Sequence, residues 1–247
     1  MNFKKHIPNT LTLLNLFAGL CALIHAFNGN YAEAFSLVCL GIFFDYWDGF
    51  LARILDVKSA LGLQLDSLAD MVTSGVVPGL IVYKMLADIQ ENQAQYSLTE
   101  ETYYMGVVPY IGFLITLGSC YRLANFNIDT RQTDSFIGLP TPANALMICS
   151  LPIILEQTGG ESFVFEYLSN PYVLVVIALI STFLLNAEIP LFSLKLKSFA
   201  WKPNKLQYSF LLVSLVLLVS LEFAAIPLII VAYVLTSLLF KPSTSHL

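Results

Sequence analysis

The stretch that decides the fold lies at residues 45–70 and reads DYWDGFLARILDVKSALGLQLDSLAD. Four of its aspartates form two pairs within otherwise apolar sequence, Asp45 with Asp48 and Asp66 with Asp70. Spacings of three and four residues place both members of a pair on one face of a helix. We therefore expect two antiparallel helices, joined by a short connection, that bring the four carboxylates together at one depth.

The sequence around this stretch is too apolar for a soluble protein. Of the 247 residues, 57% are hydrophobic and 12% are charged, and the mean hydropathy is +0.73, whereas about a quarter of the residues in soluble domains are charged. The apolar residues gather in eight runs suited to crossing about 30 Å of hydrocarbon as helices. We predict an all-α integral membrane protein, a polytopic bundle with spans at about 7–28, 32–55, 62–86, 104–124, 139–156, 171–189, 207–221 and 224–240.

The placement of charge predicts how this bundle is oriented. If both termini are cytoplasmic, eleven of the twelve basic residues lie on the cytoplasmic side, as the positive-inside rule requires: Lys4, Lys5, Arg53, Lys58, Arg122, Arg131, Lys195, Lys197, Lys202, Lys205 and Lys241. Lys84 is the exception. The four aspartates then lie at the cytoplasmic end of their helices. The localisation that follows is the cytoplasmic (inner) membrane, with a site that faces the cytoplasm.

The four carboxylates need positive partners. An aspartate near the centre of a bilayer costs about 2.5–3.5 kcal/mol on insertion scales, and Arg53 and Lys58 can neutralise two charges at most. Divalent cations with a preference for oxygen ligands, Mg²⁺, Mn²⁺ or Ca²⁺, supply the remainder, and Mg²⁺ in particular is commonly shared between carboxylates and substrate phosphates. The small residues Gly49, Ala52 and Gly62 lie near the same faces and either allow a ligand to approach or serve close helix packing.

Other chemistries receive little support from the sequence. No basic tract suited to nucleic acid is present. The four cysteines lie inside apolar runs without the spacing of a zinc site or a disulfide framework, so we expect them to pack in the bundle: Cys21, Cys39, Cys120 and Cys149.

The spacing of these residues resembles a family signature. The pattern Asp-x2-Asp-Gly-x2-Ala-Arg-x8-Gly-x3-Asp-x3-Asp between Asp45 and Asp70 is similar to that of the CDP-alcohol phosphotransferase family, whose members transfer a phosphatidyl or related group from a CDP-linked donor to an alcohol and release CMP. The resemblance implies a six-helix catalytic core, a homodimer and a divalent-metal site that holds two ions.

The resemblance also implies roles for particular positions. Asp45, Asp48 and Asp66 would hold Mg²⁺ or Mn²⁺ on the donor pyrophosphate, and Asp70 would be the general base and a further metal ligand. CDP would be bound by Gly49, Ala52, Arg53 and Gly62. The whole chain 1–247 would be a single membrane domain with a core at 6–189, a basic cytoplasmic connection at 190–206 and two additional C-terminal helices at 207–241.

Flanking segments narrow the expected acceptor. Residues 7–16, 66–78, 122–127, 138–143 and 189–195 resemble family members that use L-serine, over about residues 6–200. The expected reaction converts CDP-diacylglycerol and L-serine to phosphatidylserine and CMP, a step of phospholipid biosynthesis in contact with membrane lipids. Serine carries a carboxylate that needs a cation, so we expect an acceptor site at Arg122 with Asn125 or Asn127, or at Arg131.

Two alternatives remain open at this stage. The same transfer could use another alcohol, glycerol 3-phosphate or inositol, although a phosphorylated acceptor would need a larger basic cluster. A cation transporter also uses carboxylates inside the membrane. Its carboxylates would more naturally lie near the bilayer midplane on broken helices.

Overall fold

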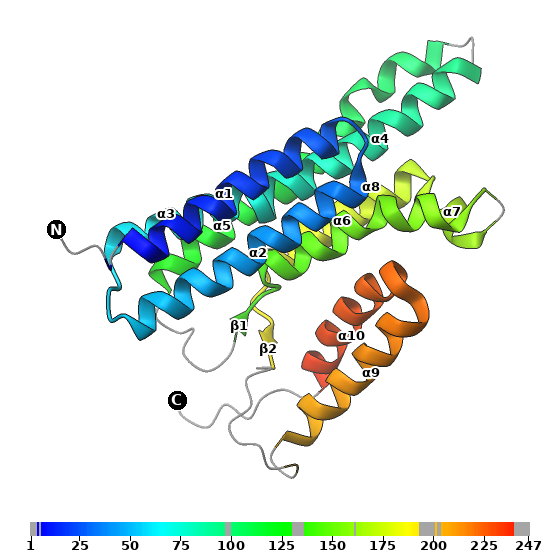
Figure 1. The fold of residues 1–247 in the computed structure, drawn as a ribbon. Coiled ribbons are helices and arrows are strands. Elements are labelled where there is room, and N and C mark those ends of the chain that lie inside the picture. Colours follow the sequence, from blue (N-terminus) through cyan, green and yellow to red (C-terminus); the bar gives the residue numbers. More distant parts are fainter. Residues whose placement is uncertain are drawn as a thin grey trace.

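The chain folds into a bundle of helices (Figure 1). The structure is a computed structural model and describes residues 4, 6–96, 100–129, 136–160, 162–192, 201 and 204–239. The first half contains α1 (His6–Phe27), α2 (Tyr31–Ile54), α3 (Ala60–Asp70), the π-helical segment η2 (Met71–Val76), α4 (Val77–Tyr96), the 3₁₀ segment η3 (Glu100–Gly112) and α5 (Phe113–Ile128). The second half contains α6 (Thr141–Thr158), α7 (Phe163–Leu168), α8 (Pro171–Asn186), α9 (Lys205–Leu221), η5 (Glu222–Ala224) and α10 (Ala225–Leu239).

The predicted fold class, an all-α polytopic membrane protein, is confirmed. Within the described residues, five helical stretches are long and apolar enough to cross a membrane: His6–Phe27, Tyr31–Ile54, Ala60–Glu91, Gly106–Ile128 and Lys205–Leu239. Pro171–Asn186 is a shorter apolar helix. The last of the five stretches is interrupted at Glu222, whose φ is 48°, and α9 and α10 lie side by side as the two-helix hairpin expected there (Figure 1).

The structure differs from the predicted elements at three places. The third helix continues beyond residue 86 to Tyr96, and the paired ends of α4 and η3 extend past the rest of the bundle (Figure 1). Residues 89–96 read IQENQAQY, and most of them favour helix although they are too polar to be counted in an apolar run. The short helix α7 and a two-stranded sheet, β1 (Phe136–Ile137) with β2 (Pro190–Leu191), are too short to give a periodic signal.

Helix α1 is the element around which the first half is arranged. It packs along α2 and also against α3, η2 and α4. Glycines permit the close approach, because a Cβ atom at Gly41 of α2 would lie 2.7 Å from Asn15 Oδ1 and from Thr73 Cγ2. Small residues at helix crossings serve this purpose in membrane proteins.

The relation between α2 and α3 corrects one expectation from the sequence. They are joined by the short connection 55–59, but their backbones are not closely packed, whereas α1 packs against both. The two helices nevertheless bring Asp45, Asp48 and Asp66 together as expected.

The strand pair ties together the segments before α6 and after α8. Gly138 has a φ of 73°, and its N–H donates to the Ile189 carbonyl at 2.9 Å. A Cβ atom at Gly138 would lie 2.7 Å from the Leu185 carbonyl oxygen. Both the left-handed backbone and the close contact therefore favour glycine at this position.

Candidate functional site

Three of the four aspartates form one cluster. Each of Asp45, Asp48 and Asp66 offers a carboxylate oxygen, and these oxygens all lie within 4.8 Å of one another. Oxygen ligands about 2.0–2.6 Å from one cation lie at most about 4–5 Å apart. The donor set and its spacing therefore fit a hard divalent cation.

Among the described residues, no lysine or arginine forms an ion pair with the three clustered aspartates. Arg53 and Lys58, the two cations nearest in the sequence, are exposed. Asp48 is only 6% exposed, so water screens its charge poorly. A bound cation would relieve the repulsion among these carboxylates.

Local structure explains how the two halves of the cluster are presented. Asp45 and Asp48 lie in the last turns of α2, and Asp66 lies in the middle of α3. Ser59 caps α3, because its hydroxyl accepts a hydrogen bond from the Gly62 N–H at 3.0 Å. This cap starts the helix immediately after the short connection and so fixes the distance from the cap to Asp66.

Asp70 has a different setting from the other three aspartates. It is the last residue of α3, and the π-helical segment Met71–Val76 follows directly. π-Helical segments are rare in proteins, and those that occur often lie at functional sites. The carboxylate is 9% exposed and attracts the guanidinium of Arg122, and Asp70 is not one of the three grouped ligands. Its predicted part as a further metal ligand stays a prediction.

The positions expected to bind CDP lie along the same segment. Gly49, Ala52 and Gly62 are half-buried, and Arg53 is exposed. A Cβ atom at Gly49 would meet nothing within 4 Å, so the space in front of this glycine is open. That opening lies one residue from Asp48.

The positions expected to bind the acceptor lie on α5, apart from Arg131. Arg122 of α5 is 8% exposed, its Nη2 donates to the Gly138 carbonyl at 3.5 Å, and its Nε has no partner in the structure. Asn125 is exposed. Asn127 donates from Nδ2 to Ser67 Oγ at 2.9 Å, a bond between α5 and α3. Arg131 lies outside the described residues.

Sequence reasoning gave no role to two side chains of α1 that contact the acidic site. Thr12 donates a hydrogen bond to Asp48 Oδ2, and Asn15 donates one to Asp70 Oδ1 at 3.0 Å. The available signal was the recurrence of polar residues three positions apart within an apolar run.

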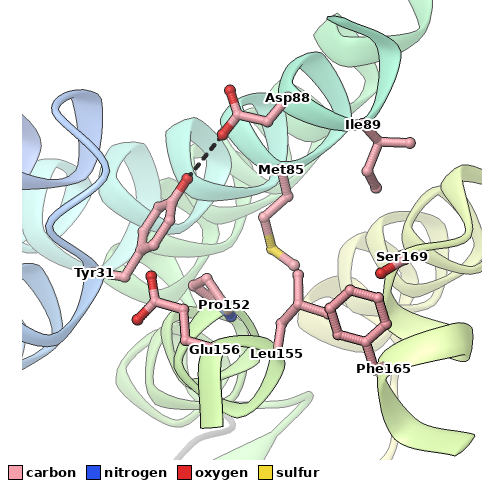
Figure 2. Close-up of a pocket in the computed structure, with 9 residues that line it drawn as sticks. All are labelled: Tyr31, Met85, Asp88, Ile89, Pro152, Leu155, Glu156, Phe165 and Ser169. Carbon is pink, nitrogen blue, oxygen red and sulfur yellow. Dashed lines mark hydrogen bonds between the residues drawn. The ribbon is translucent and has the colours of Figure 1, made fainter. Parts of the chain in front are cut away.

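A cavity of about 420 Å³ lies away from the acidic cluster, between the start of α2, the middle of α4 and the last turns of α6 (Figure 2). Its wall is mostly apolar, and the Tyr31 hydroxyl donates to Asp88 at 3.3 Å across its edge (Figure 2). Lys84 pairs with the same carboxylate at 3.2 Å. None of the four aspartates of the site, Asp45, Asp48, Asp66 and Asp70, lines this cavity. Its lining residues are Tyr31, Met85, Asp88, Ile89, Pro152, Leu155, Glu156, Phe165 and Ser169.

The fold and the acidic cluster define a polytopic membrane protein with a carboxylate site suited to a divalent cation. The family model for CDP-alcohol phosphatidyltransferase matches residues 5–184, which is most of the chain and includes the whole aspartate segment. The chain therefore belongs to the CDP-alcohol phosphatidyltransferase family and is a transferase.

Several curated relatives are named as serine O-phosphatidyltransferases or as a related synthase. The CDP-diacylglycerol–serine O-phosphatidyltransferase of Bacillus subtilis is 33% identical over 169 residues, which cover 64% of this chain and 85% of that protein. The protein of the same name from Helicobacter pylori strain J99 is 32% identical over 153 residues, 61% of this chain and 58% of its own length. Archaetidylserine synthase of Methanothermobacter thermautotrophicus is 30% identical over 158 residues, 61% of each chain. The match thus spans less than two thirds of the last two relatives.

Metal binding at the cluster should stabilise the folded protein. For protein stripped with EDTA, Mn²⁺ at about 100 times its Kd should add about 2.7 kcal/mol and raise the apparent Tm by about 5–11 °C. Asp48→Asn should lose most of this rise. Asp88→Asn, at the other end of the bundle, is the matched control and should keep it. The Tm of each variant is measured by thermal unfolding in detergent. An equal rise in Tm in both variants would place the ion elsewhere.

Proposed function

We propose that this protein transfers the phosphatidyl group of CDP-diacylglycerol to L-serine and releases CMP, with dependence on Mg²⁺ or Mn²⁺. The observation that carries the proposal is the cluster of Asp45, Asp48 and Asp66, with ligand oxygens within 4.8 Å, inside a chain of the CDP-alcohol phosphatidyltransferase family. The names of the relatives from B. subtilis and H. pylori support the donor and the acceptor.

In this proposal Asp45, Asp48 and Asp66 hold the divalent ions, two per site as the family resemblance implies, and Asp70 would be a further ligand. Bound metal supplies charge neutralisation at the pyrophosphate, which makes phosphorus a better electrophile. The chain's own part is to fix three carboxylates in place before the donor arrives. Preorganised charge of this kind needs no rearrangement during the reaction.

Asp70 takes the proton of the acceptor hydroxyl. The serine oxygen then forms a bond to the phosphorus that carries the diacylglycerol group, and the bond from that phosphorus to the bridging oxygen breaks, so CMP leaves with the electron pair. The acceptor proton is on Asp70 at the end of this step. Arg122 attracts the Asp70 carboxylate, and it orients the base or contacts the acceptor carboxylate.

The remaining contacts follow the same assignment. Gly49, Ala52, Arg53 and Gly62 bind the CDP moiety, and the opening in front of Gly49 supports access of a ligand to the α2 backbone. Arg122, Asn125 and Arg131 are the acceptor set. Catalysis is assigned to residues 6–189, with 190–206 as a cytoplasmic connection and 207–241 as additional helices.

The setting of the enzyme is part of the proposal. We place the acidic site on the cytoplasmic side of the inner membrane, because the charge distribution along the sequence puts Arg53, Lys58 and Arg122 on that side. Serine and CMP are soluble there, whereas the acyl chains of donor and product stay in the bilayer. A homodimer, which the family resemblance implies, belongs to the same proposal.

An acceptor panel tests the reaction. Purified protein with CDP-diacylglycerol and Mn²⁺ should release CMP with L-serine, and release should stop when EDTA removes the metal. Parallel reactions contain glycerol 3-phosphate, inositol or no alcohol, and phosphatidylserine is identified by mass spectrometry. Release with another alcohol but not with serine would contradict the acceptor, and no release with any alcohol would contradict the whole assignment.

Replacement of Asp70 tests the base. Asp70→Asn should lower kcat by about 10²–10⁴-fold, the usual contribution of a general base, while CDP-diacylglycerol still binds in an equilibrium assay. The matched control is Asp56→Asn in the exposed connection, where φ is 51°, a backbone that asparagine tolerates. The control should retain full activity. A fully active Asp70→Asn enzyme is incompatible with the role assigned to Asp70.

A further inference from the structure

Helix α1 contributes two buried polar side chains, and each contacts a different aspartate of the acidic site. Thr12 is 3% exposed and Asn15 is fully buried. We propose that both are positioning residues for the reaction: Thr12 orients the metal ligand Asp48, and Asn15 orients the base Asp70. The inference rests on the proposed function and adds α1 to the helices that build the site.

The Thr12 hydroxyl has two possible acceptors. Its Oγ lies 3.1 Å from the Pro8 carbonyl, one turn earlier in α1, and closer to Asp48 Oδ2. A hydroxyl donates one proton, and the carboxylate is the stronger acceptor because it carries charge. The bond occupies Oδ2 and fixes the plane of the Asp48 carboxylate. The Asp48 carboxylate keeps further lone pairs for a cation shared with Asp45 and Asp66.

Asn15 contacts the π-helical segment η2 through its backbone and Gly41 through its side chain, in addition to Asp70. Its backbone carbonyl accepts a hydrogen bond from Thr73 Oγ at 3.1 Å, and Thr73 belongs to the π-helical segment that follows Asp70. On the other side, the glycine at position 41 leaves the space that the amide occupies. The Asn15 amide then donates from Nδ2 to Asp70 Oδ1 at 3.0 Å. One buried amide thus connects α1 with the end of α3.

The charge of the acceptors distinguishes these bonds from ordinary polar contacts between helices. Elsewhere in the bundle a buried polar pair joins two neutral groups, since Ser181 donates to Asn144 Oδ1 at 2.6 Å. Polar pairs of that kind hold membrane helices together. Thr12 and Asn15 instead each donate to a carboxylate. Helix α1 therefore contacts one aspartate of each pair, Asp48 and Asp70. Such supporting hydrogen bonds commonly set how well a ligand binds its metal.

The two residues act through different aspartates, so their loss should have different effects. Loss of the Thr12 hydroxyl leaves Asp48 free to turn and weakens metal binding. Loss of the Asn15 amide leaves the cluster intact but lets the Asp70 carboxylate move away from the acceptor. A purely structural role would instead lower stability and change both properties together.

Direct Mn²⁺ binding tests the role of Thr12. Protein stripped of metal is titrated with Mn²⁺ in the absence of substrates, and free Mn²⁺ is measured by electron paramagnetic resonance. Thr12→Val should weaken binding by about tenfold, and Thr12→Ser, which keeps the hydroxyl, should restore it. Thr10→Val is the matched control and should bind Mn²⁺ as the wild type does. The exposed Thr10 hydroxyl donates to the His6 carbonyl one turn earlier in the helix, and among the described residues it has no bond to an aspartate of the site.

Asn15→Ala completes the test with the opposite pattern. Its Mn²⁺ affinity should fall less than that of Thr12→Val, because the three grouped ligands Asp45, Asp48 and Asp66 stay in place, while kcat for CMP release should fall by at least about tenfold. Equal Mn²⁺ affinity in Thr12→Val and the wild type, or unchanged kcat in Asn15→Ala, would overturn the positioning roles even if the wild type is fully active. A wild-type protein that binds no Mn²⁺ would instead overturn the metal site and the inference with it.

Discussion

Repulsion among carboxylates inside an apolar bundle is the constraint on which the rest of the structure depends. Asp45, Asp48 and Asp66 present oxygens within 4.8 Å of one another in a membrane protein, where unpaired charge is unfavourable. The described residues around them supply no ion pair. Such an arrangement is sustainable when a divalent cation completes it, and this requirement links the fold to the chemistry of a pyrophosphate donor.

The surrounding helices hold this site by different means. A hydroxyl cap at Ser59 starts α3, and the π-helical segment after Asp70 brings Thr73 against the Asn15 carbonyl of α1. Gly41 gives the space in which α1, α2 and the π-helical segment meet. The exposed apolar side chains of α9 face outward, and none of its residues is buried, as expected for a helix in contact with lipid.

The aspartate pairs, the small residues and the apolar runs could be predicted from the sequence because each follows helical periodicity or a membrane-spanning length. The contacts of Thr12 and Asn15 could not, because a polar residue within an apolar run does not reveal which partner it meets across 36 or 55 residues. The same holds for the separation of α2 from α3. The extension of α4 to Tyr96 was missed because polar helical sequence lacks the apolar signal.

The measurement that tests the central claim most directly is the position of a metal in the protein with CDP-diacylglycerol bound. Crystals grown with Mn²⁺ and the donor, and measured at the manganese absorption edge, should give an anomalous peak between Asp45, Asp48 and Asp66 and against the donor pyrophosphate. A peak at the far end of the bundle, beside Asp88 and Glu156, or a donor bound away from the three carboxylates, would contradict the account.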